Sequence, residues 1–539
     1  MGRSNNGMKE TTTSKLIILV SIFFILFGNL TFFSNVIEVY PVNLSNSLFL
    51  LSLALVFFSI NIMLLSLLCY KHTIKPVLIT ITLISASTAY FMDSYNVVID
   101  DVMIDNIIKT DIAESLDLIS FKFFIYIIFL GVLPSVWIYT LNITTLPIKK
   151  EFISKLKLFS FALTVFISLI LIFGNFYASF IREHKPLRFY ANPSYYLYSI
   201  GKYASSFVSS EPTKLTKIGL DAKIPPTDEH RELVFLVVGE TVRSDHFSLN
   251  GYKKKTNPYL EKEEVLSFKN VWSCGTSTAV SVPCMFSIFD RSSYKKENAY
   301  DTENVLDVLQ RAGVNVLWLD NNSDSKGVAL RVPYESYKND KVNPSCDIEC
   351  RDEGMLANLQ RYIDDHPQGD IFIILHQMGN HGPAYFKRYP SQFKKFTPTC
   401  ETNQLEKCSQ QEITNTYDNA ILYTDYFLSK AIKLLNKNND HFESALLYVS
   451  DHGESLGEKG LFLHGLPYMF APDSQKHVPL LMWFSTSFEK DEINFDALKN
   501  KLANKYSHDN IFHTLLGLME VKTSIYDKSL DIIDHPDEN

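Results

Sequence analysis

The apolar residues of this chain are concentrated in its first third. Runs of about 20 mostly apolar residues, the length that a helix needs to cross a bilayer, occur only there. A cleavable signal peptide is the alternative for the first run, but no small-residue cleavage site follows it. The runs predict a membrane domain over residues 1–181 with five transmembrane helices, at roughly 15–33, 46–70, 75–94, 122–141 and 157–180.

Charged residues between the runs predict the orientation of these helices. Lysine and arginine concentrate before the first run, between the second and third, and between the fourth and fifth. Cytoplasmic loops are enriched in these residues, so we expect these ends to lie inside. The loop after the third run carries six acidic residues, from Asp100 to Asp117, against the single Lys109. Five spans that start inside then place the rest of the chain outside.

The pattern changes after the last apolar run. Residues 182–230 are rich in aromatic and basic residues, which favours a connector along the membrane surface that ends in a linker; a surface helix packed on the next domain fits equally well. From residue 231 to 539, short buried-strand runs alternate with helical stretches, which is typical of an α/β domain. The predicted strands are 233–239, 314–320, 371–377, 445–451 and 478–484, and the predicted helices are 301–313 and 416–437.

Composition narrows the class of protein. The chain has 539 residues, a formal net charge of −8 and an isoelectric point near 6.0. A nucleic-acid-binding domain would carry a basic face, so we expect no nucleic-acid partner. Six of the seven cysteines follow residue 231, and an even number outside the membrane favours disulfides over a zinc cluster, because no CxxC pair occurs. Neighbours in sequence suggest the pairs Cys274–Cys284, Cys346–Cys350 and Cys400–Cys408.

Residues of metal-ligand type follow two of the predicted strands. Glu240 comes after strand 233–239, and Asp451 and His452 lie at the end of strand 445–451. Ligands at the carboxyl ends of buried strands are typical of α/β active sites, and carboxylate and imidazole groups suit zinc. Three ligands leave one position open, which an oxygen of the "GTST" loop at 275–278 could fill. A metal-bound hydroxyl is a stronger nucleophile, but these residues alone do not distinguish Thr276, Ser277 and Thr278.

Three further histidines lie near predicted strand ends. His381 in "HQMGNHGP" and His464 in "LFLHGLP" are in glycine-containing loops. Each is either a loop histidine with purely structural contacts or a ligand for a substrate phosphate or a second metal ion. His376 lies closer to its strand, and a structural role is as well supported there as a functional one.

Five segments together carry a resemblance to a known family. They are "VVGETVRSDHFSLNGY", "SCGTSTAVSVPCMFS", "DNNSDSKGV", "HQMGNHGPAY" and "YVSDHGESLGEKGLFLHGLPY". In this order, and after five apolar runs, they resemble the phosphoethanolamine transferases of Gram-negative inner membranes, especially the lipid A-modifying branch that includes polymyxin-resistance enzymes. The resemblance covers essentially the whole chain. It implies a five-helix transmembrane domain followed by a soluble α/β catalytic domain of the alkaline phosphatase and sulfatase type.

The resemblance also implies roles for individual residues. Glu240, Thr278, Asp451 and His452 would bind the catalytic zinc, with Thr278 as the nucleophile, and the Cys274–Cys284 bridge would hold the nucleophile loop. The substrate side would be formed by His381 and His464 at the phosphate or a second zinc, by Asn322 and Lys326 near the transferred group, and by Glu114 of the acidic outer loop at the headgroup. Helix capping is an equal alternative for Glu114.

The implied reaction is transfer of phosphoethanolamine from phosphatidylethanolamine to a phosphate of lipid A, through a phosphoethanolamine-threonine intermediate. The product carries less negative charge and would bind polymyxins less well. We expect a monomer in the Gram-negative inner membrane with its catalytic domain in the periplasm. The alternatives are a core-sugar acceptor, glycerophosphoryl transfer by an enzyme of the same fold, a simple phosphatase or sulfatase, and a membrane sensor that only binds metal or lipid.

Overall fold

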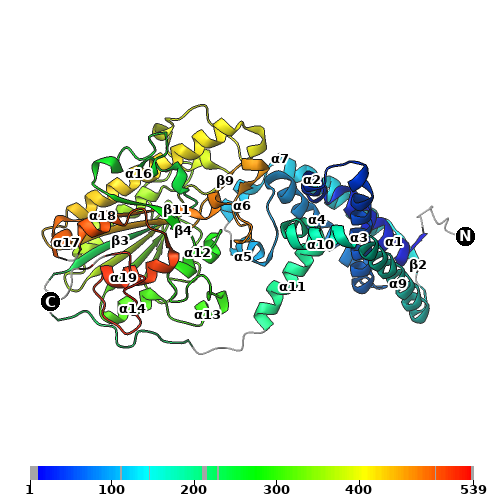
Figure 1. Ribbon diagram of the computed structural model, residues 1–539, viewed down its shortest axis with the longest axis horizontal. Helices are drawn as coiled ribbons and strands as arrows, with labels where there is room; N and C mark the ends of the chain where they lie inside the picture. The colour runs from blue at the N-terminus through cyan, green and yellow to red at the C-terminus, as the bar shows by residue number, and fades with distance from the viewer. Residues whose placement is uncertain are drawn as a thin grey trace, which may run out of the picture. The chain divides into compact units, whose positions relative to one another are not determined.

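The computed structural model describes residues 10–109, 112–144, 146–208, 215–226, 230–491, 493–533 and 535. The chain forms two compact units (Figure 1). The helical unit comprises Met1–Asp105 and Ile119–Val208. The other unit comprises Asn106–Leu118 and Ser209–Asn539, and it is called the catalytic unit because it contains most of the predicted catalytic domain. Each unit has its own hydrophobic core.

The helical unit contains the predicted membrane spans. Four stretches in the described part of the chain are long and apolar enough to cross a bilayer: α3 (Leu44–Leu68), α4 (Ile74–Tyr95), Phe121–Thr140 and α9 (Ile148–Ile172). A fifth candidate is the pair α1 (Thr13–Phe27) and α2 (Leu30–Val39), if it counts as one span. The five expected spans therefore correspond to four helices and one bent pair.

The first predicted span is broken at Gly28 and Asn29. Here α1 and α2 meet at a bend of 57°. The side-chain amide of Asn29 donates to the carbonyls of Phe24 at 2.8 Å and Asn192 at 2.6 Å, and its oxygen accepts from the backbone N–H of Asn192 at 2.9 Å. An asparagine side chain that bonds to backbone groups in this way competes with the helical ladder, which explains the bend.

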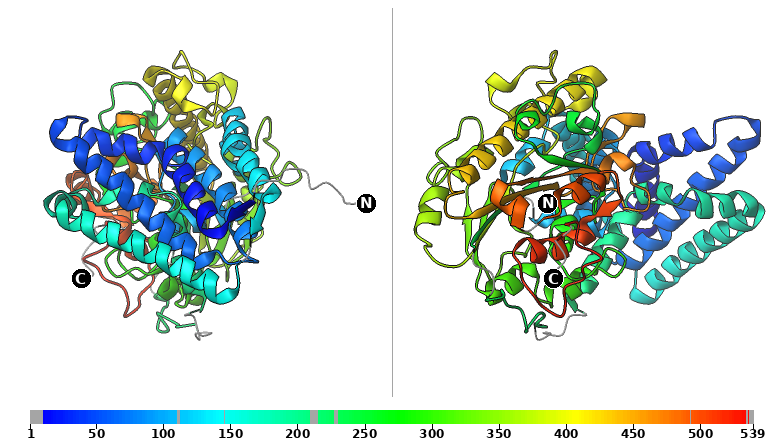
Figure 2. Two further views of the ribbon diagram at one scale, coloured as in Figure 1. Left: turned by 90° about the vertical axis from the view of Figure 1, so that its right-hand side faces the viewer. Right: turned by 60° about the vertical axis from the view of Figure 1, so that its left-hand side comes forward.

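The long helices pack through small and apolar residues, and α3 lies along α9 (Figure 2). Their shared core includes Leu65, Leu78, Ile138 and Ala162. The span Phe121–Thr140 consists of α7 (Phe121–Tyr126), a π-helical segment (Ile127–Val132) and α8 (Leu133–Thr140). Large apolar side chains on the outside of the unit suit contact with lipid.

The expected connector is largely helical. The helical unit ends with α10 (Gly174–Glu183), a 3₁₀ segment (Lys185–Tyr190) and α11 (Ser194–Val208). Tyr196 of α11 is buried, and its hydroxyl donates to the carbonyl of Ile81 at 3.1 Å. This part of residues 182–230 therefore packs on the helical unit. The remaining elements of the first third are β1 (Glu10–Thr12), β2 (Asn142–Thr144), α5 (Asp101–Lys109) and α6 (Ile112–Leu118).

An eight-stranded sheet forms the centre of the catalytic unit, in the order β12-β4-β11-β8-β3-β7-β5-β6. All five predicted strands are confirmed, as β3 (Glu232–Gly239), β5 (Asn315–Asp320), β7 (Ile371–His376), β8 (Glu443–Ser450) and β11 (His477–Phe484). Three strands were not predicted: β4 (Leu266–Trp272), β6 (Tyr334–Ser336) and β12 (Tyr506–Ser507). Polar residues interrupt β4, and the other two are too short for a periodic signal.

The sheet is parallel where the candidate site forms. β3 lies between β7 and β8 and runs parallel to both, and β5 pairs in parallel with β7. Strands of this kind are buried on both faces, which explains their continuous apolar runs. Figure 1 shows α16 (Gln410–Asn436) over one face and α14 (Val305–Ala312) and α19 (Ile511–Leu518) over the other. The carboxyl ends of β3, β5, β7 and β8 therefore meet at one edge of the sheet.

The two predicted helices begin at different residues from those expected, because side-chain caps set their starts. α14 begins after Asn304, which forms a capping box with Asp307, and ends at Gly313 with a φ of 104°. α16 begins after Ser409, which forms a capping box with Glu412. The remaining elements are α12 (Thr278–Met285), α13 (Lys296–Tyr300), α15 (Leu359–Asp364), α17 (Thr486–Asp491), α18 (Phe495–Asn500), β9 (Ser455–Leu456) and β10 (Phe462–Leu463).

Candidate active site

Three buried side chains meet where β3 and β8 end. Glu240 follows β3, and Asp451 and His452 follow β8. All three are fully buried, and one ligand atom of each lies within 4.8 Å of the others. His452 Nε2 is 3.4 Å from Glu240 Oε1 and 3.2 Å from Asp451 Oδ2. The parallel pairing of β3 with β8 brings together residues that are more than 200 positions apart in sequence.

The donor atoms and burial of this cluster suit a bound cation. Burial, and then the neighbouring Asp451, raise the pKa of Glu240, and burial raises the pKa of Asp451 to about 6. Burial, and then His464, lower the pKa of His452 to about 4, so its imidazole is neutral at neutral pH. Two buried carboxylates beside a neutral imidazole are costly without a positive partner, and they are the donor types that zinc takes. The residues therefore fit a divalent metal ion.

The hydroxyl of Thr278 points into the same cluster. Thr278 is the first residue of α12, and its Oγ1 lies 3.3 and 3.2 Å from the two carboxylate oxygens of Glu240 and 3.4 Å from His452 Nε2. The hydroxyls of Thr276 and Ser277, the other two candidates, have different surroundings. Thr276 Oγ1 donates to the carbonyl of Leu466 at 2.6 Å, and Ser277 occupies the N-cap position. Of the three candidates, the structure brings only Thr278 into contact with the cluster.

The loop that carries Thr278 is held from several sides. Cys274 and Cys284 form a disulfide that joins the start of the loop to α12. The backbone N–H of Gly275 donates to Ser281 Oγ at 2.9 Å, and a Cβ atom at Gly275 would lie 2.8 Å from the Cβ of Val280. Only glycine fits this turn, so the resting position of the hydroxyl is set before substrate binds.

Sequence reasoning missed His508, which holds the loop that carries Thr278 through a hydrogen bond at Cys274. His508 is buried; its Nδ1 accepts a hydrogen bond from the backbone N–H of Cys274 at 3.1 Å, and its Nε2 donates to the carbonyl of Ser450 at 3.0 Å. It therefore joins the loop that carries Thr278 to the end of β8. No motif surrounds His508 in sequence, and its distance from residue 274 left no local signal.

Because His508 is buried with a lowered pKa, we expect the folded protein to lose stability in acid. Burial lowers the pKa of His508 to about 3, whereas an unfolded histidine titrates near 6.5. Below about pH 6.5 the unfolded state binds a proton that the folded state refuses, so stability is full above that pH. It falls by about 1.4 kcal/mol per pH unit until pH approaches the folded pKa. His508→Asn, which keeps an acceptor for Cys274 but does not titrate, should show a shallower decline of melting temperature between about pH 7 and 5. Equal slopes for the two proteins would contradict this assignment.

Three histidines form a row at this edge of the sheet. The ring of His464 lies 4.2 Å from that of His452 and 5.7 Å from that of His381, measured between centroids. His464 Nδ1 is 3.2 Å from Glu454 Oε1, and Glu454 is fully buried. The structure thus brings both loop histidines to the same edge of the sheet as Thr278.

The other predicted residues have different surroundings. Asn322 donates through Nδ2 to Glu240 Oε2 at 2.7 Å and to the carbonyl of Gln377 at 2.8 Å, so it orients the carboxylate. Lys326 is buried, and its Nζ donates to Ser323 Oγ at 2.6 Å. It lines a small cavity with Tyr300 and Arg331. The structure gives Lys326 no contact with Thr278 among the described residues.

His376 is held in a buried pair beneath the site. Its Nδ1 lies 2.9 Å from Asp320 Oδ2, which also accepts from the indole N–H of Trp318 at 2.9 Å. Asp320 in turn accepts from the backbone N–H of Asn322 at 2.9 Å. Glu114 lies in α6, but its side chain is outside the described part of the chain.

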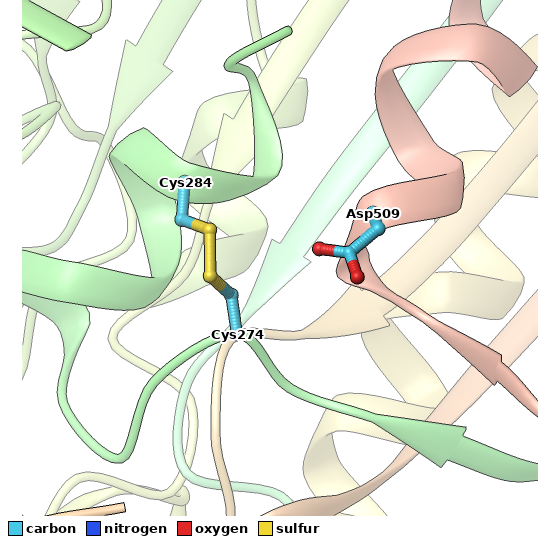
Figure 3. Close-up of side chains that lie close together, drawn as sticks. All are labelled: Cys274, Cys284 and Asp509. Carbon is cyan, nitrogen blue, oxygen red and sulfur yellow. A yellow bond between two sulfur atoms is a disulfide. The ribbon is translucent and has the colours of Figure 1, made fainter. Parts of the chain in front are cut away.

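All three expected disulfides are present: Cys274–Cys284, Cys346–Cys350 and Cys400–Cys408. A second cluster of metal-ligand type consists of Cys274, Cys284 and Asp509. Figure 3 shows the two sulfur atoms bonded to each other beside the carboxylate of Asp509. Asp509 Oδ1 accepts from the backbone N–H of Arg291 at 2.8 Å. Because the thiols are consumed in the disulfide, this cluster is a structural feature.

Two family models match the chain. The sulfatase model covers residues 232–521, and the model described as phosphoethanolamine transferase EptA/EptB covers residues 57–207. The first match corresponds to the α/β part of the chain and the second to most of the apolar part. Together they confirm the predicted fold class.

Similar proteins span nearly the full chain. Phosphatidylethanolamine transferase Mcr-2 of Escherichia coli is 44% identical over 93% of this chain and 94% of its own length. Phosphoethanolamine transferase EptA of Escherichia coli (strain K12) is 42% identical over 94% of this chain and 93% of its own length. The structure of the integral membrane protein lipooligosaccharide phosphoethanolamine transferase A (EptA) from Neisseria meningitidis is 38% identical, with a TM-score of 0.93, and covers 97% of this chain and 99% of that one. The chain therefore belongs to the phosphoethanolamine transferase family, within the alkaline phosphatase-like superfamily.

Proposed function

We propose that the protein transfers phosphoethanolamine from phosphatidylethanolamine to a phosphate of lipid A, with Thr278 as the nucleophile. The observation that carries the proposal is the position of the Thr278 hydroxyl, 3.2 Å from Glu240 Oε2 and 3.4 Å from His452 Nε2. The names of relatives that are 42% and 44% identical to the chain support the donor. The predicted lipid A acceptor is consistent with membrane anchorage, because both substrates are then lipids.

Zinc is the proposed metal. Glu240, Asp451 and His452 supply two carboxylates and a neutral imidazole, and the Thr278 oxygen completes a four-ligand set of the kind that zinc takes. When bound there, zinc lowers the pKa of the threonine hydroxyl and offsets charge on the phosphoryl oxygens. Asn322 holds the Glu240 carboxylate in place, as ligands of metal sites are commonly held by neighbouring hydrogen bonds.

The transfer proceeds in two displacements at phosphorus. Thr278 Oγ1 attacks the phosphorus of phosphatidylethanolamine, and the bond from phosphorus to the diacylglycerol oxygen breaks. Diacylglycerol leaves with the proton of the threonine hydroxyl, and a phosphoethanolamine-threonine ester remains. An oxygen of a lipid A phosphate then attacks the same phosphorus, the bond to Oγ1 breaks, and Thr278 takes up a proton from solvent.

The surroundings of Thr278 favour this chemistry. Phosphoryl transfer depends mainly on positioning and on stabilising charge on the equatorial oxygens. The N-terminal end of α12, where Thr278 lies, carries partial positive charge that favours an anionic group. In this proposal His381 and His464 bind the substrate phosphate or a second zinc ion. Asn322 and Lys326 lie near the transferred phosphoethanolamine, and Glu114 contacts the headgroup. The added ammonium group lowers the negative charge of lipid A and weakens the binding of polymyxins.

The proposed setting is the inner membrane of a Gram-negative cell. The helical unit anchors the chain, and the catalytic unit works as a monomer in the periplasm, where its three disulfides are stable. A tethered enzyme searches a surface for its lipid substrates instead of a volume.

The donor is tested with two lipids offered side by side. Phosphatidylethanolamine and phosphatidylglycerol, each radiolabelled in the headgroup, are presented with lipid A to the membrane-inserted protein. Label should enter the acceptor from the ethanolamine lipid. Label that enters only from the glycerol lipid would favour the glycerophosphoryl alternative and contradict the proposal.

The acceptor is tested by mass spectrometry of lipid A from a polymyxin-sensitive Gram-negative host that expresses the chain. An increment of one phosphoethanolamine group on lipid A is expected. The same increment on the core oligosaccharide alone would move the acceptor to a core sugar.

A further inference from the structure

One segment of the chain contributes to the catalytic unit although it lies between two candidate membrane spans in sequence. This segment, Asn106–Leu118, packs with the catalytic unit. The side chain of its Asp117 is only 7% exposed. One carboxylate oxygen of Asp117 accepts from Arg388 Nη2 at 2.7 Å, and the other pairs with Lys387. The backbone carbonyl of Asp117 accepts from Asn403 Nδ2 at 2.7 Å.

Arg388 connects this carboxylate to the candidate active site. The Arg388 side chain is 3% exposed, and its guanidinium donates in three directions. Nη2 donates to Asp117, Nη1 to Glu349, and Nε to the backbone carbonyl of His381 at 2.7 Å. A guanidinium group is planar and rigid, so the two carboxylates that hold one edge also fix the direction of Nε.

Two of the disulfide loops present partners to this network. Glu349 lies inside the Cys346–Cys350 loop, and Asn403 lies inside the Cys400–Cys408 loop. Short cross-linked loops lose little further freedom when their side chains bind. Both disulfides therefore hold residues that contact Asp117 and Arg388, namely Asn403 and Glu349.

The chain on the other side of His381 is held by separate contacts. Asp352 accepts from the backbone N–H groups of Met378 at 2.9 Å and Gly379 at 3.2 Å. The N–H of Asn380 donates to the carbonyl of Glu240 at 3.0 Å. These bonds fix the residues before His381, and Arg388 holds the carbonyl of His381 itself.

We infer that Asp117 is a positioning residue for phosphoethanolamine transfer, because its pairing with Arg388 fixes the guanidinium that holds His381. This inference rests on the proposed role of His381 in the transfer. The segment Asn106–Leu118 then contributes to catalysis besides joining two spans. When Asp117 is paired with Arg388, His381 is aligned with His464 and His452, the row of histidines that reaches Thr278. When this pair is not formed, Arg388 loses one of the two carboxylates that orient it.

A purely structural clip would behave differently. Lys387 also pairs with Asp117, but its side chain is 36% exposed, whereas the Arg388 side chain is 3% exposed and donates to the carbonyl of His381. If Asp117 only fastened the segment to the unit, removing Lys387 or Arg388 would lower stability and activity to a similar extent. A positioning role depends on Arg388, because its side chain contacts both Asp117 and the carbonyl of His381.

The test uses the full-length protein in proteoliposomes with headgroup-labelled phosphatidylethanolamine and lipid A. The variants are Asp117→Asn, Arg388→Lys, their double variant, and Lys387→Met as the matched control. Asp117→Asn and Arg388→Lys should each lower kcat by about 10- to 100-fold, with little change in the KM for the donor, because a small misplacement of a catalytic group is costly. The double variant should lose little more than either single variant. Lys387→Met should keep kcat within about twofold, because a partly exposed ion pair contributes little.

Melting temperatures of the variants distinguish a loss of activity through misplaced His381 from a loss through unfolding. A kcat that stays at the wild-type value in Asp117→Asn, whether or not the melting temperature falls, would overturn the inference. Fully additive losses in the double variant would overturn it as well, because Asp117 would then not act through Arg388. If the unaltered protein transfers no phosphoethanolamine from this donor, the proposed function fails, and the inference fails with it.

Discussion

Replacing Thr278 by valine is expected to abolish phosphoethanolamine transfer. Valine keeps the shape of threonine but has no oxygen, so no covalent bond to phosphorus can form. Rate losses on removal of a catalytic nucleophile are large, and we expect kcat/KM for the donor to fall by on the order of 10⁴-fold or more. Thr278→Ser should retain measurable transfer, because its hydroxyl can still reach Glu240 and His452. The measurement is release of labelled headgroup from phosphatidylethanolamine onto lipid A.

The neighbouring hydroxyls provide matched controls. Thr276→Val and Ser277→Ala remove hydroxyls two and one positions before Thr278. Thr276 Oγ1 donates to the carbonyl of Leu466, and Ser277 is the N-cap residue of α12. Both variants should retain transfer. The adduct can be located in the tryptic peptide 270–291, which contains all three hydroxyls. Fragmentation that places the phosphoethanolamine group on Thr276 or Ser277 would contradict the assignment, as would full activity of Thr278→Val.

Replacing Glu240 by glutamine should remove the metal and, with it, the activity. The cluster holds two buried carboxylates, and glutamine has the same size but one negative charge fewer. Ligand charge contributes strongly to zinc affinity, so the purified variant should contain much less zinc than the unaltered protein. We expect a loss of kcat/KM on the order of 10³-fold or more, because the metal and its ligands act as a unit. Zinc content by elemental analysis and transfer rate should fall together.

Glu232 is the control for this variant. It lies at the opposite end of the same strand, β3, and is as fully buried as Glu240. Glu232→Gln should keep zinc and transfer, although its stability can change. Normal zinc content in Glu240→Gln would contradict the proposed ligand set. A zinc-loaded Glu240→Gln protein without activity would leave Glu240 a role other than metal binding.

The large features of the fold follow from local patterns. The five β-strands that the sequence predicts are mostly apolar runs, and all five lie in the central sheet. Four of them pair in parallel, which buries both of their faces, whereas β11 pairs antiparallel with β8 and β4. The apolar runs of the first third also fall where the long helices are. The misses have local causes: polar residues interrupt β4, and the side chain of Asn29 breaks the first span. Helix starts shifted because Asn304 and Ser409 act as caps.

The candidate metal ligands were also within reach of sequence reasoning. Glu240, Asp451 and His452 follow apolar runs directly, and such positions share one edge of a parallel sheet. The disulfide pairs were also predictable, because each joins two cysteines that are close in sequence. The choice of Thr278 among three adjacent hydroxyls was not accessible from the residues, since it depends on the direction in which each side chain leaves the first turn of α12.

The amino-acid pattern alone indicated the membrane spans, the α/β class and the candidate metal ligands Glu240, Asp451 and His452, because apolar periodicity and strand ends are local properties of the chain. The supports of the site depended on the tertiary fold. His508 meets Cys274 across more than 200 residues, and Asp117 meets Arg388 across 271. No local pattern encodes such contacts, because they exist only after the sheet and its loops have brought distant segments together.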